Sequence, residues 1–181
     1  MFRYALLRTV LNPMLAVASD QGLVRLEFLP HAYQYHTHAH AVARGLEPEA
    51  DIIESSSHFE TLLDELSEYF IGRREEFTMP LDLHGSEFQL KVWTRLQTIP
   101  YGRLRTYGQV ARGIRRPSAS RAVGQAARQN PVPILVPCHR VIGKKGSLVG
   151  FASGLTDKAR LLRLEGHTLD DASWLKEPQL F

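Results

Sequence analysis

The chemistry of this chain centres on its single cysteine, Cys138, which lies in the segment NPVPILVPCHRVIG between a proline and a histidine. A thiol becomes a nucleophile when it ionises, and a neighbouring base or cation lowers its pKa from a free value of about 8.5. A lone cysteine is most often an inert buried side chain. The three preceding prolines and the Cys-His-Arg sequence favour a reactive thiol here.

His139 is the nearest candidate base for that thiol, and Glu165 is a candidate acceptor for the second nitrogen of the imidazole. Adjacent residues of an extended segment point to opposite faces, so we expect a water molecule to bridge the thiol and the imidazole. Glu165 falls in the last turn of a predicted helix, where a carboxylate opposes the helix dipole. We therefore expect another group to compensate its charge.

The composition limits the class of protein. Hydrophobic residues make up 44% of the 181 residues, which suits one or two compact domains with their own cores. A single cysteine excludes an internal disulfide, so we expect a reducing, cytoplasmic location. No apolar run approaches the roughly 20 residues of a membrane span, so no membrane partner is expected.

Positive charge is concentrated in the second half of the chain. The formal net charge is only +3, but no Asp or Glu lies between Arg95 and Arg128. The arginines of that stretch are residues 95, 103, 105, 112, 115, 116, 121 and 128. This distribution predicts a positive face and an anionic partner such as a nucleic acid backbone.

The first half predicts a small α/β domain, residues 1–83. Residues 14–28 read as two strands joined by a turn at Asp20–Gly22. Residues 29–45 have no clean periodicity and are interpreted as a loop. Residues 57–72 predict a helix that begins with a capping box of Ser57 and Glu60 and ends at Gly72.

The second half, residues 86–169, predicts a mainly helical domain, followed by a tail, 170–181. Helices are expected at 86–96, 106–114, 119–129 and 156–166. The first two begin with capping boxes, Ser86 with Gln89 and Thr106 with Gln109, and the last is expected to be capped by Thr156. The two middle helices, separated at Pro117, resemble a helix-turn-helix. The predicted fold class is therefore α+β.

The second helix of that pair, residues 119–129, consists largely of small residues after Arg121. Small side chains allow close packing of helices, which is one interpretation. They also allow close approach to a nucleic acid groove, with Arg121 reaching outward, which is the other.

The blocks SEFQLKVW, IPYGRLRTYGQVA, SRAVGQAARQNP, PVPILVPCHRVIG and RLLRLEG resemble, in order, those of the O6-alkylguanine-DNA alkyltransferases, which repair DNA by direct reversal. The resemblance covers roughly residues 86–166. It implies that Cys138 accepts the alkyl group, that His139 and Glu165 activate it through a water, and that Asn130 braces the turn before it. It also implies that the helix-turn-helix docks in the minor groove.

The resemblance assigns further residues by position. Tyr107 would crowd the target phosphate and help to rotate the nucleotide, and Arg121 would fill the vacated space in the base stack. Other DNA contacts are expected at Thr106, Ala122, Gly124, Gln125 and Ala127, and a substrate pocket at Pro133, Val149, Phe151 and Ala152. The chain has Phe151 where the family often has Tyr and Ser153-Gly154 where it has Gly-Gly, and it lacks the family's tryptophan around Arg160. These departures bear on substrate preference.

The implied partner is double-stranded DNA carrying O6-alkylguanine, with O4-alkylthymine as a second candidate substrate. The alkylated base must be flipped out of the duplex before the thiolate can reach it. Nothing in the motif could remove the alkyl group from Cys138, so each molecule should act once. No cofactor or metal is expected. A monomer is expected, and cooperative assembly on DNA is left open.

Three alternatives compete with this reading. A non-catalytic lesion-binding relative would lack the cysteine, and a cysteine hydrolase would need an oxyanion hole and turnover. A helix-turn-helix regulator would not need the sequence PCHR. Separately, the histidines at 31, 36, 38 and 40 could bind a metal, but a solvated loop is the favoured interpretation.

Overall fold

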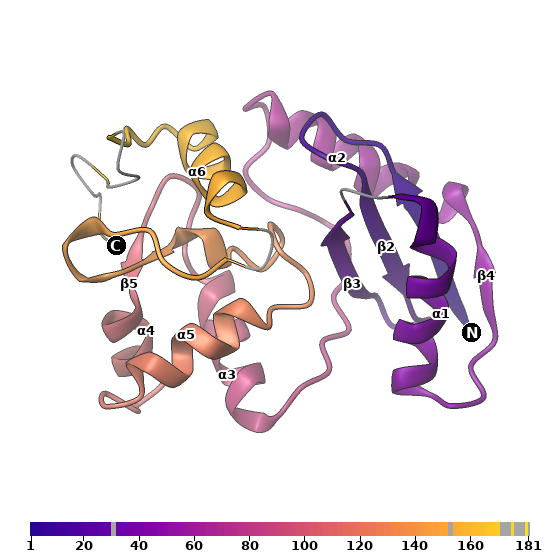
Figure 1. Cartoon of the computed structure of the whole chain (residues 1–181), viewed down its shortest axis with the longest axis horizontal. Coiled ribbons are helices and arrows are strands. Elements are labelled where there is room, and N and C mark those ends of the chain that lie inside the picture. Colours follow the sequence, from indigo (N-terminus) through magenta and orange to yellow (C-terminus); the bar gives the residue numbers. More distant parts are fainter. Residues whose placement is uncertain (30–31, 152–153, 171–174, 176–179, 181) are drawn as a thin grey trace. The chain divides into compact units, whose positions relative to one another are not determined.

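The computed structural model describes residues 1–29, 32–151, 154–170, 175 and 180 (Figure 1). The chain divides into two compact units, Met1–His84 and Gly85–Phe181. Among the described residues, no helix has both the length and the apolar character needed to cross a membrane.

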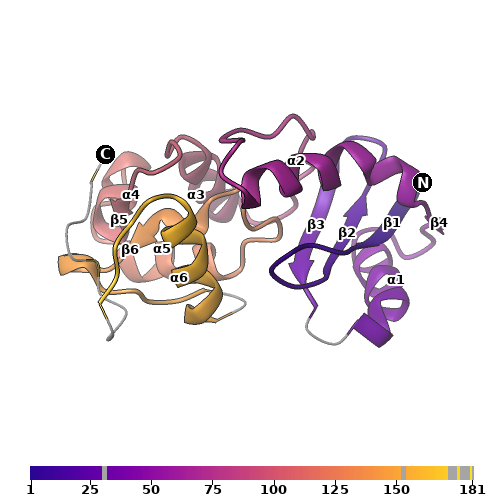
Figure 2. The same cartoon turned by 90° about the horizontal axis from the view of Figure 1, so that it is seen from above.

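The first unit is built on a four-stranded sheet in the order β3-β2-β1-β4. Its strands are β1 (Phe2–Leu7), β2 (Met14–Ala18), β3 (Leu23–Phe28) and β4 (Ile52–Glu54). The β2–β3 hairpin confirms the two predicted strands, whereas β1 and β4 were not predicted. β1 pairs antiparallel with β2 and parallel with β4. Every residue of β2 is buried, because this strand lies inside the sheet and helices cover both of its faces (Figure 2).

One face of the sheet is covered by α1 (Tyr35–Leu46), which follows the short 3-10 helix η1 (Ala32–Gln34). The predicted loop over residues 29–45 is therefore wrong. The buried positions of α1 are Ala39 and Ala43, four residues apart, which pack with β1 and β2 residues in one cluster. The helical period could not be recognised in the sequence, because the buried stripe contains small rather than large apolar residues. The exposed positions hold histidine and threonine, which gave no clear pattern either.

The other helix of the unit, α2 (Glu60–Phe70), carries the predicted apolar stripe and buries Leu62, Leu66 and Tyr69. The chain enters it through the 3-10 helix η2 (Ser56–Phe59). Ser57 therefore lies inside that turn, and neither helix start has a side-chain cap, so the predicted capping box is wrong. Gly72 ends the helix as predicted, with a φ of 71°.

The second unit is mainly helical. Its helices are α3 (Glu87–Gln97), α4 (Tyr107–Gly113), α5 (Ser120–Arg128) and α6 (Leu155–Leu164). Short strands β5 (Arg105–Thr106) and β6 (Val141–Ile142) pair in parallel, and 3-10 turns η3 (Cys138–Arg140) and η4 (Lys144–Gly146) flank β6. Both capping boxes are confirmed. The predicted Thr156 cap is wrong, because α6 begins one residue earlier, after Gly154.

The helix-turn-helix is formed by α4 and α5, and α3 packs against both helices. Trp93 of α3 is 2% exposed, and its indole Nε1 donates a 2.8 Å hydrogen bond to the carbonyl of Ala126 in α5. This bond fixes α5 against the core of the unit. Together with the sheet of the first unit, this arrangement confirms the predicted α+β class.

The expected tail at 170–181 lies largely outside the described residues. Within it, Leu175 is buried in a cluster with Leu104, Leu148 and Leu162. Its backbone N–H donates to the carbonyl of Gly146 at 3.2 Å. The described part of this segment therefore packs on the second unit.

The bond from Trp93 gives a first prediction. Trp93→Phe should destabilise the second unit by about 1–3 kcal/mol, because the buried Ala126 carbonyl loses its donor. Urea unfolding followed by circular dichroism measures this, with Thr94→Ser on the exposed side of α3 as the matched control. Equal unfolding midpoints for the two variants would contradict the role given to the indole.

Candidate active site

The turn that carries the cysteine is tight and strained. The backbone N–H of Val136 donates to the carbonyl of Val132 at 2.9 Å, and Ile134 between them has a φ of 77°. A β-branched residue in this left-handed region costs on the order of 1–3 kcal/mol. Cys138 then begins η3, so the expected extended geometry around the cysteine is wrong.

Asn130, two residues after the end of α5, holds this turn together. Its Nδ2 donates to the carbonyl of Val136 at 2.7 Å and to Cys138 Sγ at 3.1 Å. Its Oδ1 accepts the backbone N–H of Val132 at 3.0 Å. One buried amide therefore connects the end of α5 to the sulfur atom, as the expected bracing role requires.

The Cys138 thiol lies in a buried site and is 3% exposed. Burial raises the pKa of this thiol, whereas the hydrogen bond from Asn130 and the positive charge of Lys158 act to lower it. At rest the sulfur is therefore a thiol, in surroundings that already contain groups able to stabilise a thiolate.

His139 is fully buried, and its Nε2 lies 2.7 Å from Oε1 of Glu165. Burial lowers the pKa of His139, and the carboxylate of Glu165 raises it only in part, so the imidazole is neutral near pH 7. A carboxylate can only accept, so the proton is assigned to Nε2 and the basic lone pair to Nδ1. This pair matches the predicted partners of the cysteine.

Arg140 supplies the compensating charge that the position of Glu165 requires. Its Nε donates to both carboxylate oxygens, at 3.1 and 2.9 Å, and its Nη2 donates to Oε1 at 2.9 Å. Its Nη1 donates to the carbonyl of Ile99 at 2.6 Å. Burial alone would raise the pKa of Glu165, but His139 and Arg140 together hold that pKa well below its usual range. This role of Arg140 was not predicted from the sequence, although the residue stands in the PCHR motif.

Lys158 is the second residue that the sequence analysis missed. It is 0% exposed, and its Nζ donates to the carbonyls of Val141 and Val149 at 2.6 and 2.9 Å. Burial lowers its pKa to about 8. The sequence offered one sign of its place in the site. Lys158 stands seven residues before Glu165, which is two helical turns earlier on the same face of the helix.

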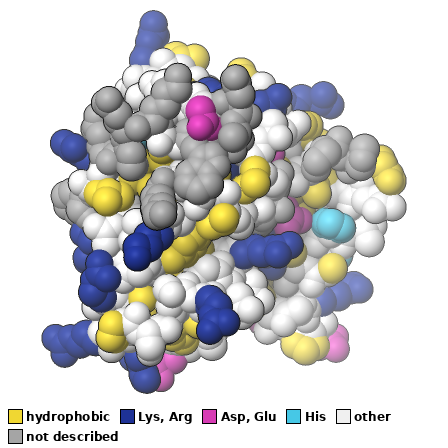
Figure 3. Space-filling model, turned by 60° about the vertical axis from the view of Figure 1, so that its left-hand side comes forward, with side chains coloured by type: hydrophobic (Ala, Val, Ile, Leu, Met, Phe, Trp, Pro, Cys, Tyr) yellow, Lys and Arg dark blue, Asp and Glu magenta, His cyan; other side chains and the backbone are white. Residues whose placement is uncertain are grey.

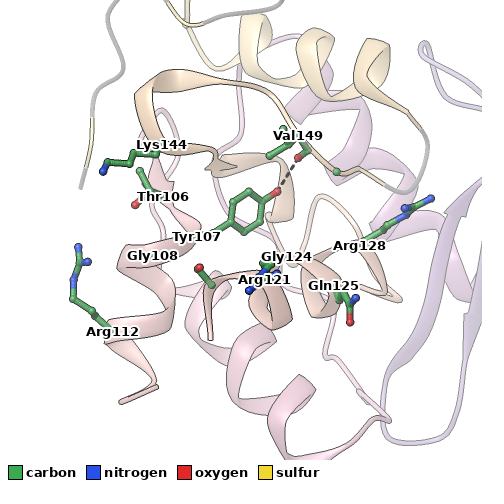
Figure 4. Close-up of a pocket in the computed structure, with 12 residues that line it drawn as sticks. Thr106, Tyr107, Gly108, Arg112, Arg121, Gly124, Gln125, Arg128, Lys144 and Val149 are labelled. Carbon is green, nitrogen blue, oxygen red and sulfur yellow. Dashed lines mark hydrogen bonds between the residues drawn. The ribbon is translucent and has the colours of Figure 1, made fainter. Parts of the chain in front are cut away.

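A cavity of about 720 Å³ opens beside this site, between α4, α5 and the segment that follows η4 (Figure 4). Of the predicted residues it brings together Thr106, Tyr107, Arg121, Gly124, Gln125 and Val149. The lining residues that were not predicted are Gly108, Arg112, Ser120, Arg128, Lys144 and Gly150. Arg112 and Arg128 belong to the arginine-rich stretch, so the predicted positive charge does reach this cavity.

Tyr107 lies between the cavity and the cysteine. Its hydroxyl donates to the carbonyl of Val149 at 2.8 Å, as the dashed line in Figure 4 marks. Burial raises the pKa of Tyr107, and a thiolate at Cys138 raises it further, so the phenol keeps its proton. The ring borders the cavity and is electrostatically coupled to the sulfur.

The remaining predicted residues divide into three groups. Ala122 is exposed on α5, whereas Ala127 is 2% exposed and its side chain packs inward. The DNA contacts expected of these two residues stay predictions. Pro133 and Phe151 are buried, and Ala152 and Ser153 lie outside the described residues. One face of this helix packs inward, as the first interpretation of its small residues expects, and the other face lines the cavity. The close approach to a nucleic acid groove stays a prediction.

Lys and Arg side chains are spread over the side of the molecule shown in Figure 3, with hydrophobic side chains between them. The Arg and Lys residues that line the cavity are Arg112, Arg121, Arg128 and Lys144. Such a mixture of cationic and apolar groups suits a partner with a charged backbone and flat bases.

Three of the four histidines that were considered as metal ligands, His36, His38 and His40, lie on α1 and not in a loop. His36 Nδ1 is 2.8 Å from the hydroxyl of Tyr4, and His38 Nδ1 is 3.2 Å from Glu27 Oε1. His31 lies outside the described residues. Within the described part of the chain, no group of three His, Cys, Asp or Glu side chains could hold a metal ion.

This fold and site define a two-part protein in which a helix-turn-helix unit contains a buried cysteine with a histidine–glutamate pair. The second unit matches the model of the 6-O-methylguanine DNA methyltransferase DNA binding domain over residues 87–167. Residues 2–83 match the ribonuclease-like domain of the same methyltransferase. The chain therefore belongs to the 6-O-methylguanine DNA methyltransferase family, a family of DNA repair enzymes.

Individual relatives agree with this assignment. The chain is 40% identical to the methylated-DNA–protein-cysteine methyltransferase of Methanosarcina acetivorans over 163 residues, 90% of this chain and 97% of that protein. It is 52% identical to the protein of that name from Mycolicibacterium paratuberculosis over 112 residues, 62% of this chain and 68% of that protein. The crystal structure of Mycobacterium tuberculosis OGT in complex with DNA has a TM-score of 0.77 and 38% identity, covering 91% of this chain and 93% of that one.

The charge on Glu165 gives a second prediction. Since the folded pKa of Glu165 lies below the ordinary value, its ionised form stabilises the fold above pH 4.5, and this contribution is lost as the pH falls further. Glu165→Gln should lower stability at pH 7 by about 3–5 kcal/mol, because Arg140 loses a buried partner. Its thermal midpoint should also fall less than that of the wild type between pH 5 and pH 3.

The control is Glu60→Gln, which changes an exposed carboxylate at the start of α2. It should keep the wild-type profile in thermal melts at both pH values. If Glu165→Gln has the stability of the wild type at pH 7, its carboxylate does not hold this site together.

Proposed function

We propose that this protein repairs DNA by moving the alkyl group of O6-alkylguanine irreversibly onto Cys138, once per molecule. The observation that carries the proposal is the buried arrangement around the sulfur, in which Asn130 donates to Sγ and the His139–Glu165 pair stands beside it. The DNA complex of the Mycobacterium tuberculosis relative supports DNA as the partner.

Activation begins with removal of the thiol proton. His139 takes that proton on Nδ1 through a bridging water, while its Nε2–H remains hydrogen-bonded to Glu165. The resulting imidazolium lies against an ionised carboxylate, which lowers the cost of forming it. Asn130 donates a hydrogen bond to the sulfur throughout, and this bond strengthens as the sulfur becomes a thiolate.

The thiolate then attacks the alkyl carbon on guanine O6. A carbon–sulfur bond forms as the carbon–oxygen bond breaks, and the bonding electron pair leaves with the oxygen. Guanine becomes neutral when its ring takes up a proton from water, which balances the proton that the thiol gave to His139. The product is a thioether at Cys138. Among the described residues, no group next to the sulfur is suited to hydrolyse this bond, so the protein is consumed. O4-alkylthymine would present the same alkyl carbon and is a second candidate substrate.

The cavity beside Tyr107 is the proposed site of duplex binding in the minor groove, through α5. Arg121 would enter the base stack as the damaged nucleotide turns outward, and Tyr107 would crowd its phosphate. Thr106, Gly124, Gln125 and Ala122 would lie along the backbone, and Val149, Phe151 and Pro133 beside the flipped base. Contacts of this kind depend on the charge of the phosphates. The affinity for DNA should therefore fall as the salt concentration rises, whatever the DNA sequence. We propose that the protein binds as a monomer.

A cysteine hydrolase is a weaker candidate. It would need backbone N–H groups directed at an oxyanion next to the sulfur. The N–H of Cys138 instead donates to the carbonyl of Val136 at 2.8 Å, and that of Arg140 donates to the carbonyl of Pro137 at 3.0 Å. Proline at 137 has no N–H at all. The N–H groups of Cys138 and His139 also act on the sulfur itself and lower its pKa. They therefore stabilise a thiolate more directly than an oxyanion beside it, which favours direct displacement over acyl transfer.

The proposed reaction makes a third prediction. Incubation with a duplex containing O6-methylguanine should add the mass of one methyl group to the protein, located on Cys138 by peptide mapping. Cys138→Ser should bind the same duplex but take up no methyl group, because an alcohol is a far weaker nucleophile near neutral pH. Repair of several guanines by each protein molecule would contradict the single-use mechanism.

The role given to Arg121 makes a fourth prediction. Arg121→Ala should slow transfer from a duplex by at least about tenfold more than transfer from free O6-methylguanine base, since only the duplex requires flipping, which costs a few kcal/mol. Arg163→Ala, an exposed arginine of α6 that does not line the cavity, is the matched control. Single-turnover kinetics on both substrates measure the ratio. Equal losses on the two substrates would exclude a role in extrusion.

A further inference from the structure

The side chain of Lys158 is a buried cation that the proposed mechanism has not used. It is 0% exposed, and its Nζ donates to the carbonyls of Val141 and Val149 and lies 3.5 Å from the hydroxyl of Tyr107. Among the described residues, none of its hydrogen-bond partners is a carboxylate. A buried ammonium is costly without a counter-charge, so its presence requires an explanation.

The groups that face Lys158 come from three elements. Cys138 and His139 belong to η3, and Tyr107 belongs to α4, with its ring centroid 5.8 Å from Nζ. On α6 itself, Glu165 is bound by His139 and Arg140, and Asp157 lies 3.5 Å from Arg160. Both acids therefore have other cations beside them. Cys138 is the group facing Lys158 that acquires negative charge during the reaction.

The electrostatics of the two side chains are reciprocal. The charge of Lys158 lowers the pKa of Cys138, and a thiolate at Cys138 raises the pKa of Lys158. Burial is the larger effect on Lys158 and leaves its pKa at about 8, so the ammonium form still predominates at pH 7. Lys158 therefore already carries its charge when the thiol loses its proton.

We propose that Lys158 is a positioning residue whose buried ammonium is the counter-charge of the Cys138 thiolate, held in place by the carbonyls of Val141 and Val149. This inference rests on the proposed alkyl transfer and deepens it. The thiol proton passes to His139, and Lys158 keeps its own proton. When the sulfur gains the alkyl carbon and guanine leaves with the electron pair, the thiolate charge disappears and Lys158 is left without its counter-charge.

The two carbonyls also give Lys158 a mechanical role. Val141 begins β6, directly after η3, and Val149 lies in the segment that borders the cavity. Val149 accepts from both Lys158 and Tyr107, at 2.9 and 2.8 Å. The ammonium thus connects the cysteine-bearing turn to the cavity edge. A test must separate this connection from the effect of charge.

The test titrates the cysteine itself by nuclear magnetic resonance. Because Cys138 is the only cysteine, labelling with [3-13C]cysteine gives one Cβ signal whose shift reports thiol ionisation without any reagent having to reach the site. Lys158→Met removes both charge and hydrogen bonds, and Lys158→Gln keeps a donor for the carbonyls. Lys91→Met, at an exposed lysine of α3, is the matched control.

In both Lys158 variants the midpoint of the Cys138 thiol titration should rise by about one pH unit or more, which is a tenfold change in the ionisation constant. Lys91→Met should leave this midpoint unchanged. Transfer from O6-methylguanine duplex at pH 7 should fall about tenfold in Lys158→Gln, in proportion to the lost thiolate. A midpoint within about 0.3 unit of the wild type in Lys158→Gln would overturn the counter-charge role.

A second measurement does not depend on the folding of the Lys158 variants. In 13C-lysine-labelled protein, Cys138→Ser should lower the pKa of Lys158, because coupling between two sites is reciprocal. An unchanged Lys158 pKa would overturn the inference. Neither titration involves DNA. If the wild-type protein transfers no alkyl group although the variants shift both midpoints, the proposed function fails and this charge pair stands. If the wild-type protein transfers the alkyl group but the variants leave both midpoints unshifted, this charge pair fails and the proposed function stands.

Discussion

The second unit depends on one buried carboxylate, that of Glu165, at the end of α6. It cannot remain charged in that position without partners. Its two oxygens both accept hydrogen bonds from Arg140, Oε1 also accepts one from His139, and Oε2 also accepts one from the N–H of Gly102. These contacts connect α6 to η3 and to the turn after α3. The same charge that anchors the helix therefore selects the tautomer of the histidine beside the cysteine.

A second constraint connects the nucleophile to the proposed DNA-binding surface. Asn130 lies two residues after the end of α5, and its amide holds Val132, Val136 and the sulfur of Cys138. Trp93 fixes α5 from the opposite side through the carbonyl of Ala126. The helix that lines the cavity and the turn that carries the thiol are thus parts of one packed assembly, and the left-handed Ile134 is strain that this assembly must offset.

The features predicted from sequence were those determined locally or carried by a contiguous motif. The capping boxes at Ser86 and Thr106 depend on residues three apart, and both formed. The box at Ser57 failed because a 3-10 turn precedes α2, and α1 was missed because its buried stripe is Ala39 and Ala43. Arg140 and Lys158 find their partners 25 and 17 residues away, and only the fold brings those pairs together.

The central claim is that Glu165 holds His139 as a neutral imidazole with its proton on Nε2, ready to accept the thiol proton on Nδ1. The 15N chemical shifts of the His139 ring at pH 7, assigned by comparison with Glu165→Gln, test this directly. The account predicts one protonated nitrogen, Nε2, and one unprotonated nitrogen, Nδ1, because burial lowers the pKa of His139 below its usual range. An imidazolium at pH 7, or a proton on Nδ1 with Nε2 bare, would contradict it.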